Sequence, residues 1–214
     1  MIFPDPPLLV ITDCKQAATP LVRIVTAVLN AGCRWISVRE KDLAAAEQAA
    51  LTGELLAIAR DFGAVLTLHG NAALARASGA DGVHLSEGSD PSAARAALGS
   101  AALVGISVHG IEQLPALDPA TVDYAIAGPV YASPSKPGHG PALGSEGLRA
   151  LVGQARIPVI GIAGIEPGNV ADVMAAGTAG IAVMGGVMRA ADAGAHTRAL
   201  LDALAAARAQ LRAR

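Results

Sequence analysis

The segment PVIGIAGIEPGNVADVMAAGTAGIAVMGG, residues 158–186, carries the pattern that decides the fold. An apolar run over 158–165 is followed by a helical stretch over 167–177 that ends at Gly177, and then by a second apolar run over 180–186. Short apolar runs bounded by glycine are typical of buried strands, and a glycine after a helical stretch is a common C-terminal cap. The segment therefore predicts two strands joined by a helix, a crossover that makes the strands parallel.

The same unit recurs along the chain. We expect eight strands, at 8–13, 35–40, 64–70, 82–86, 103–110, 124–130, 158–165 and 180–186. Helical stretches lie at 21–32, 44–63, 145–156, 167–177 and 191–212. Eight such units in 214 residues favour an α/β protein with a closed (β/α)8 TIM barrel. An open doubly wound sheet is the alternative, but no G-x-G-x-x-G motif follows the first strand. No linker divides the chain, so we expect one domain over 1–214.

Composition excludes several classes of function. A net charge of −2 and 2% aromatic residues give no reason to expect a nucleic-acid or membrane-surface partner. No run reaches the roughly 20 apolar residues of a membrane span, and the first residues do not resemble a signal peptide. We therefore expect a cytoplasmic protein, with a homo-oligomer left open. Cys14 and Cys33 are too few for a zinc site or a disulfide framework, which favours reduced core thiols.

Polar residues follow the predicted strands at the end where barrel enzymes place their chemistry. These residues are Asp13, Arg39, Lys41, His69, Asn71, Ser86, Glu87, Ser107 and His109. Gly164, Gly185 and Gly186 follow the last two strands, where backbone N–H groups commonly bind phosphate. The Gly/Pro-rich segment 132–140 follows the sixth strand and is predicted to cover the pocket as a lid. The sequence thus predicts a phosphate-binding site at one rim.

Six motifs resemble the thiamine phosphate synthase/TenI superfamily of (β/α)8 barrels, across nearly the whole chain. They are VREKD (38–42), ADGVHLS (80–86), GISVH (105–109), DYAIAGPVYASPSKPG (123–138), PVIGIAGI (158–165) and GIAVMGG (180–186). The resemblance implies one of two reactions. The synthase branch joins hydroxymethylpyrimidine diphosphate to a thiazole phosphate with the help of Mg²⁺. The TenI branch aromatises a carboxythiazole phosphate by moving a proton, without a metal.

The chain departs from the synthase pattern at the positions that resemblance assigns to Mg²⁺. Gly70 stands in place of the aspartate of N-D-R after the third strand, and Ser89 in place of the second carboxylate. Glu87 or Asp90 would have to move in to replace them. Ser37 also replaces the glutamine of Q-x-R-E-K. These departures favour a thiazole tautomerase, an isomerase with no cofactor, over the synthase, a transferase that uses Mg²⁺.

Proton transfer needs a group that titrates near neutral pH, which points to histidine. His109 is the predicted acid/base, as the resemblance to the TenI branch implies, and His69 is predicted to assist it. The alternative for His109 is a purely structural role, in which it caps the next helix or forms hydrogen bonds at the rim. His84 is expected to be a packed barrel residue.

The predicted partner is a small phosphorylated thiazole, and resemblance supplies most of its contacts. The expected binding residues are Arg39, Lys41, Ser107, Ser133, Ser135, Lys136, Gly164, Met184 and Gly185. Arg39 and Lys41 bind diphosphate in the synthase and would hold a carboxylate in the tautomerase; otherwise they form ion pairs with Glu40 or Asp42. Ala163 replaces a family glycine, which is tolerable at negative φ. A third hypothesis is a barrel that binds ligands of this pathway without catalysis.

Overall fold

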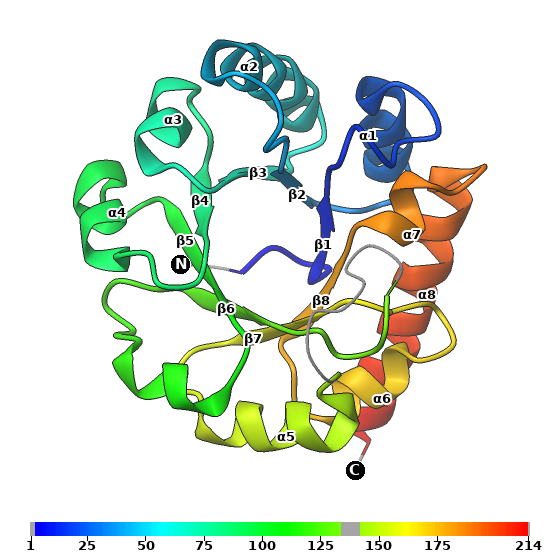
Figure 1. Ribbon diagram of the computed structural model, residues 1–214. Coiled ribbons are helices and arrows are strands. Elements are labelled where there is room, and N and C mark those ends of the chain that lie inside the picture. Colours follow the sequence, from blue (N-terminus) through cyan, green and yellow to red (C-terminus); the bar gives the residue numbers. More distant parts are fainter. Residues whose placement is uncertain (1–2, 134–141, 214) are drawn as a thin grey trace.

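The computed structural model describes residues 3–133 and 142–213. Eight parallel strands in this part of the chain close into a barrel in sequence order, because β1 pairs with both β2 and β8 (Figure 1). The predicted (β/α)8 barrel is therefore confirmed. The strands are β1 (Leu8–Ile11), β2 (Trp35–Val38), β3 (Val65–His69), β4 (Gly82–Leu85), β5 (Leu103–Val108), β6 (Tyr124–Ala127), β7 (Val159–Ile162) and β8 (Gly180–Val183).

Helices form a ring outside the strands (Figure 1). They are α1 (Leu21–Asn30), α2 (Ala45–Asp61), α3 (Ala72–Ala77), α4 (Pro91–Leu98), the 3-10 helix η1 (Ile111–Ala116), α5 (Gly144–Gln154), α6 (Val170–Ala175), α7 (Gly185–Met188) and α8 (Ala193–Arg212). In the described ranges no helix has both the length and the apolar character that crossing a membrane requires.

The strands are apolar on both faces because both faces are buried. Alternate residues point into the barrel, where they form a core of Leu9, Ile11, Trp35, Leu103, Tyr124, Ile126, Ile160 and Ala182. The intervening residues, such as Val10, Ile36 and Ile181, pack outward against the helices. This double burial explains why the sequence shows continuous apolar runs rather than alternation.

Aromatic side chains fill the amino-terminal end of the barrel. The Phe3 ring lies edge-on to Trp35, with ring centroids 5.0 Å apart, and Trp35 lies edge-on to Tyr124 at 4.9 Å. Tyr124 fits because its neighbour on β5 is Gly105: a Cβ there would lie 2.0 Å from the Tyr124 Cζ atom. Aromatic rings therefore occupy the interior at this end of the barrel.

Candidate active site

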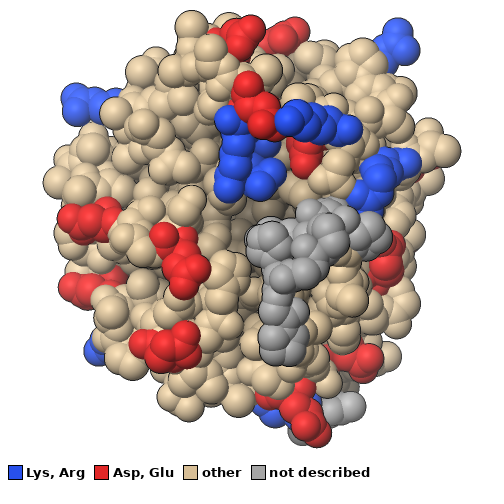
Figure 2. Space-filling model, viewed as in Figure 1, with Lys and Arg blue, Asp and Glu red and all other residues tan. Residues whose placement is uncertain are grey.

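A cavity of about 520 Å³ opens at the carboxyl ends of the strands. It lies in the hollow at the centre of the face in Figure 2, and Lys and Arg side chains gather along one edge of that hollow. Nine of the predicted site residues line it: Arg39, Lys41, His69, Ser107, His109, Ser133, Gly164, Met184 and Gly185. Ser135, Lys136 and most of the predicted lid at 132–140 lie outside the described residues.

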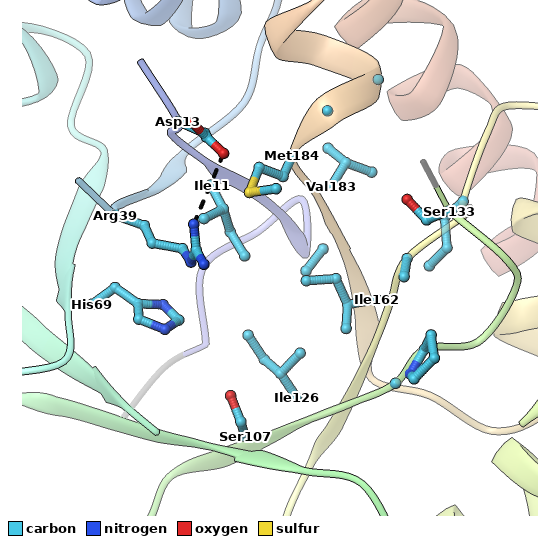
Figure 3. A pocket seen from close by; sticks show the side chains of 18 of the residues that line it. Ile11, Asp13, Arg39, His69, Ser107, Ile126, Ser133, Ile162, Val183 and Met184 are labelled. Atoms are coloured by element: carbon cyan, nitrogen blue, oxygen red, sulfur yellow. Dashed lines mark ion pairs between the residues drawn. The ribbon is translucent and has the colours of Figure 1, made fainter. Parts of the chain in front are cut away.

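The floor of the cavity has a polar half and an apolar half. On the polar half, His84 is 1% exposed, its Nε2 lies 2.9 Å from the Ser107 hydroxyl, and its ring is 4.8 Å from that of His69. Ile11, Ile126, Ile162 and Ala182 supply the apolar surface. In Figure 3, Arg39 and His69 lie on one side of the cavity and Ile162 and Ser133 on the opposite side. Such a floor suits a flat ring with a hydrogen-bonding edge.

Glu40 organises the rim after β1 and β2, although it points away from the cavity. Its carboxylate is 5% exposed and accepts hydrogen bonds from the Thr12 hydroxyl at 2.6 Å and the Cys14 backbone N–H at 2.9 Å. The Thr12 hydroxyl in turn accepts the backbone N–H of Arg39 at 3.0 Å. A buried carboxylate with several donors is a stable anchor. Glu40 therefore fixes the segments that carry Asp13 and Arg39.

Arg39 has a partner other than those expected at this rim. The sequence left open an ion pair between Arg39 and Glu40 or Asp42. In the structure Arg39 instead faces Asp13, with its Nη1 3.9 Å from Asp13 Oδ2 (Figure 3). Asp42 instead pairs with Lys15 at 2.8 Å. Glu40 is occupied by Thr12 and Cys14 because its carboxylate points into the β1 loop.

Cys14 and Cys33 differ in exposure. Cys33 is buried and Cys14 is exposed, so the core-thiol prediction is confirmed for Cys33 and wrong for Cys14. Hydrogen bonding to the Glu40 carboxylate, together with its negative charge, raises the pKa of Cys14 to about 11. Burial raises the pKa of Cys33 to about 11. Both side chains are therefore thiols at neutral pH and poor nucleophiles.

His109 lies at the open end of the cavity, with its ring orientation fixed by the backbone. Its Nδ1 is 2.7 Å from the Gly128 carbonyl oxygen, which can only accept, so Nδ1 carries a proton. Its Nε2 faces the cavity rim, 3.6 Å from Glu87 Oε2. Glu87 also accepts a hydrogen bond from the Gln113 side chain. His109 can therefore offer Nε2 to a ligand, with Glu87 as its neighbour.

The loop after β7 has the glycine expected of a phosphate site, but Ala163 in the same loop has an unfavourable positive φ. Gly164 has φ +63°, and a Cβ there would lie 2.6 Å from the Tyr131 Cβ. Ala163 has φ +79°, so the negative φ at which alanine would be tolerated here is not what the structure shows. The loop is held in place: Ala163 accepts the Tyr131 N–H at 3.1 Å, and Gly164 accepts the Asn169 amide at 2.9 Å. These bonds impose the left-handed conformation on Ala163.

The described residues do not fit the carboxylate pair that Mg²⁺ would need. Gly70 has no side chain to offer, and the Asp90 carboxylate caps α4, accepting from Ser92 N at 2.9 Å and Ala93 N at 3.3 Å. Glu87 alone remains at this side of the cavity, and it contacts Gln113 and His109. Within 3–133 and 142–213, no three His, Cys, Asp or Glu side chains are grouped as a metal site.

Sequence reasoning missed two polar residues that line the cavity, Arg189 and Glu166, and one that contacts Arg189, Gln16. Arg189, after α7, lines the cavity and donates to the Gln16 side chain, which contacts Asp13; Glu166 lines the cavity after β7. Arg189 and Gln16 lie several residues beyond their strands, where the strand-end rule does not reach. The one available signal is that Arg189 follows the glycine pair by a single helical turn.

The barrel and its cavity define a class: (β/α)8 proteins whose site lies at the carboxyl ends of the strands. The family model for thiamine monophosphate synthase matches residues 8–187, and the chain belongs to this family. It is 42% identical over 92% of its length to the thiamine biosynthesis bifunctional protein ThiM/ThiE of Symbiobacterium thermophilum, but spans only 41% of that protein.

Two further relatives are of similar size to this chain. The putative thiamine-phosphate synthase of Geobacter sulfurreducens is 38% identical, over 92% of this chain and 93% of the relative. The structure of thiamine phosphate pyrophosphorylase from Pyrococcus furiosus superposes with a TM-score of 0.83 at 29% identity, covering 94% of this chain and 96% of that one.

These relatives overturn the expectation of a thiazole tautomerase. Relatives that match over most of this chain are named thiamine-phosphate synthases. The expectation was wrong because it rested on two rim positions, Gly70 and Ser89, whereas the similarity to these relatives extends over 92% of the chain.

Proposed function

We propose that this protein is a thiamine-phosphate synthase, a transferase that joins hydroxymethylpyrimidine diphosphate to a thiazole phosphate. The observation that carries the proposal is the 38% identity to relatives of that name over 92% of this chain. In this reaction the bond between the pyrimidine methylene carbon and the diphosphate oxygen breaks, and diphosphate leaves with the electron pair. The thiazole nitrogen uses its lone pair to form the new C–N bond.

Arg39 and Lys41 are proposed to bind the diphosphate. Its departure builds negative charge on oxygen, and fixed cations stabilise such charge best when they are oriented before the reaction. Arg39 is oriented in this way, since its backbone is tied to Thr12 at 3.0 Å and its guanidinium lies near Asp13. A guanidinium is also suited to bind two phosphate oxygens at once.

The cavity floor is proposed to hold the pyrimidine. His69, His84 and Ser107 offer hydrogen-bonding groups along one side, while Ile126 and Ile162 provide apolar contact for a ring face. Ser37, which replaces the family glutamine, is fully buried and is not among the described residues that line the cavity. Recognition of the ring edge therefore falls to the neighbouring strands β3, β4 and β5.

The thiazole phosphate is proposed to bind across the cavity, after β7 and β8. Gly164, Met184 and Gly185 line this side, and resemblance assigns them backbone contacts with the phosphate. Ser133 lies beside them, and Ser135 and Lys136 continue the same motif beyond the described residues. This arrangement leaves the thiazole ring facing the pyrimidine methylene from the opposite side of the cavity, as substitution at carbon requires.

His109 and His69 take a different role from the one first assigned. The condensation needs no proton removed from carbon, because the thiazole nitrogen attacks with a free lone pair. We propose that His109 and His69 are hydrogen-bonding groups for the substrates rather than acid/base catalysts. Replacing His109 with glutamine, which keeps a polar group of similar reach, should therefore preserve most of the turnover.

Measurement of thiamine phosphate formed from the two phosphorylated substrates tests the proposal. The wild-type protein should form product, and Arg39→Met should lower kcat/KM by about 100-fold or more, since a charged hydrogen-bonding partner of the leaving group is lost. Arg149→Met is the matched control, because Arg149 is an exposed arginine on α5. Absence of product with the wild-type protein would refute the proposed function.

A further inference from the structure

Among the described residues, the cavity lacks the carboxylate pair that would bind Mg²⁺, but it is lined by several basic side chains. Gly70 and the helix-capping Asp90 leave no carboxylate pair for a divalent cation on the β3 and β4 side. Arg39, Lys41 and Arg189 line the cavity together. A diphosphate carries several negative charges, which must be balanced either by a metal ion or by side-chain cations.

Arg189 is joined to the diphosphate side of the cavity by a chain of hydrogen bonds. Arg189 Nη1 donates to the Gln16 side-chain oxygen, and Gln16 Nε2 donates to Asp13 Oδ2 at 2.6 Å. The same Asp13 oxygen lies 3.9 Å from Arg39 Nη1. Residues from the β1, β2 and β8 ends of the barrel are thus held as one group, with a guanidinium at each end.

The position of Arg189 separates it from the phosphate loop after β7. It lies at the carboxyl end of α7, whereas Gly185 begins that helix and Gly164 lies in the β7 loop. The side chain reaches the β1 segment through Gln16, so it lies next to the rim that carries Arg39 and Lys41. This placement favours the diphosphate over the thiazole phosphate as its ligand.

We propose that Arg189 is a third cationic ligand of the diphosphate, and that this group is bound by side chains without a divalent cation. The inference rests on the proposed function for the identity of the anion. Arg39 approaches from the β2 side and Arg189 from the β8 side, so that the two guanidinium groups take the charge that carboxylate-bound Mg²⁺ would otherwise balance. Gln16 positions Arg189 against Asp13.

Calorimetric titration with inorganic diphosphate tests the inference directly. In EDTA the wild-type protein should bind diphosphate, and excess Mg²⁺ should change the Kd by less than about threefold. Arg189→Gln should weaken metal-free binding by about tenfold or more, the usual effect of losing a charged hydrogen-bonding partner. Arg198→Gln, at an exposed arginine on α8, is the matched control and should bind as the wild type does. Arg189 is itself exposed, so its replacement leaves the core intact.

Three results would overturn the inference. They are diphosphate binding only when Mg²⁺ is present, an unchanged Kd in Arg189→Gln, and a loss of thiazole phosphate binding rather than diphosphate binding in that variant. The synthase assay separates this failure from failure of the proposed function. A protein that forms thiamine phosphate but binds diphosphate only with Mg²⁺ is a synthase of the ordinary kind.

Discussion

Ala163 is the residue at which the backbone departs furthest from what its side chain prefers. Its φ of +79° is costly for any residue with a Cβ, by about 1–2 kcal/mol. Ala163→Gly should therefore raise the free energy of unfolding by about 0.5–1 kcal/mol, after allowing for the extra freedom of glycine in the unfolded chain. Urea denaturation measures this change.

Ala205→Gly provides a control with the opposite expected sign. Ala205 is exposed in the interior of α8, where glycine should cost about 1 kcal/mol. If Ala163→Gly destabilises the protein as much as this control does, the left-handed conformation of Ala163 is wrong.

Cys14 reports on the buried Glu40 carboxylate that positions Arg39. Because hydrogen bonding to Glu40 raises the Cys14 pKa to about 11, the rate of Cys14 alkylation should rise about tenfold per pH unit up to pH 10 without levelling off. In Glu40→Gln the pKa should fall toward the ordinary value of about 9, and the rate should level off near that pH. Peptide mapping of the alkylated protein gives the Cys14 rate.

Asp42→Asn is the control, since Asp42 contributes least to the shift and lies in an exposed ion pair with Lys15. Equal curves for the wild type and Glu40→Gln would mean that Glu40 does not approach the thiol.

Site residues could be predicted from the sequence where they lie at the end of a strand. Residues several positions further along the loops could not be predicted in this way. Arg39, His69 and His109 directly follow or end their strands, and all three line the cavity. The side-chain partners were not predictable: Asp90 caps a helix, and Glu40 turns into the β1 loop. Those choices depend on which backbone N–H groups lie near, which only the folded loops determine.

At the scale of the elements, the fit between β5 and β6 depends on one glycine. Gly105→Ala would place a Cβ 2.0 Å from the Tyr124 ring, so we expect a loss of about 1–3 kcal/mol or more in the free energy of unfolding. Thermal and urea denaturation measure the loss. Tyr124→Leu should recover part of it in the double variant, because the clash is with the ring.

Gly153→Ala, in α5 where a Cβ would meet nothing within 4 Å, should instead be neutral or stabilising. Additive effects of Gly105→Ala and Tyr124→Leu would show that the two residues do not compete for the same space.

The order of the elements was predictable because each strand repeats one physical pattern. Burial on both faces makes all eight strands apolar, and glycine caps mark several helix ends. The strands end earlier than predicted, as at Val38 and Leu85, because the polar residues that follow leave the ladder to form the rim. Short helices such as α3 and α7 have too few turns to show a helical period.

At the scale of the whole molecule, the barrel was predictable and the branch of the family was not. Closure follows from eight parallel units in a short chain, whereas the reaction depends on a few rim positions. Gly70 and Ser89 favour the wrong branch because a lost carboxylate indicates a lost metal ligand, not a lost reaction. Cations elsewhere on the rim, after β2 and after α7, are able to balance the same charge.

The most direct test of the central claim follows both products of the condensation in one reaction. Purified protein is incubated with hydroxymethylpyrimidine diphosphate and thiazole phosphate, with Mg²⁺ or with EDTA, and thiamine phosphate and free diphosphate are quantified over time. The account predicts that the two products appear in equal amounts and that Arg39→Met loses both together. Release of diphosphate without thiamine phosphate, or no product under either condition, would contradict it.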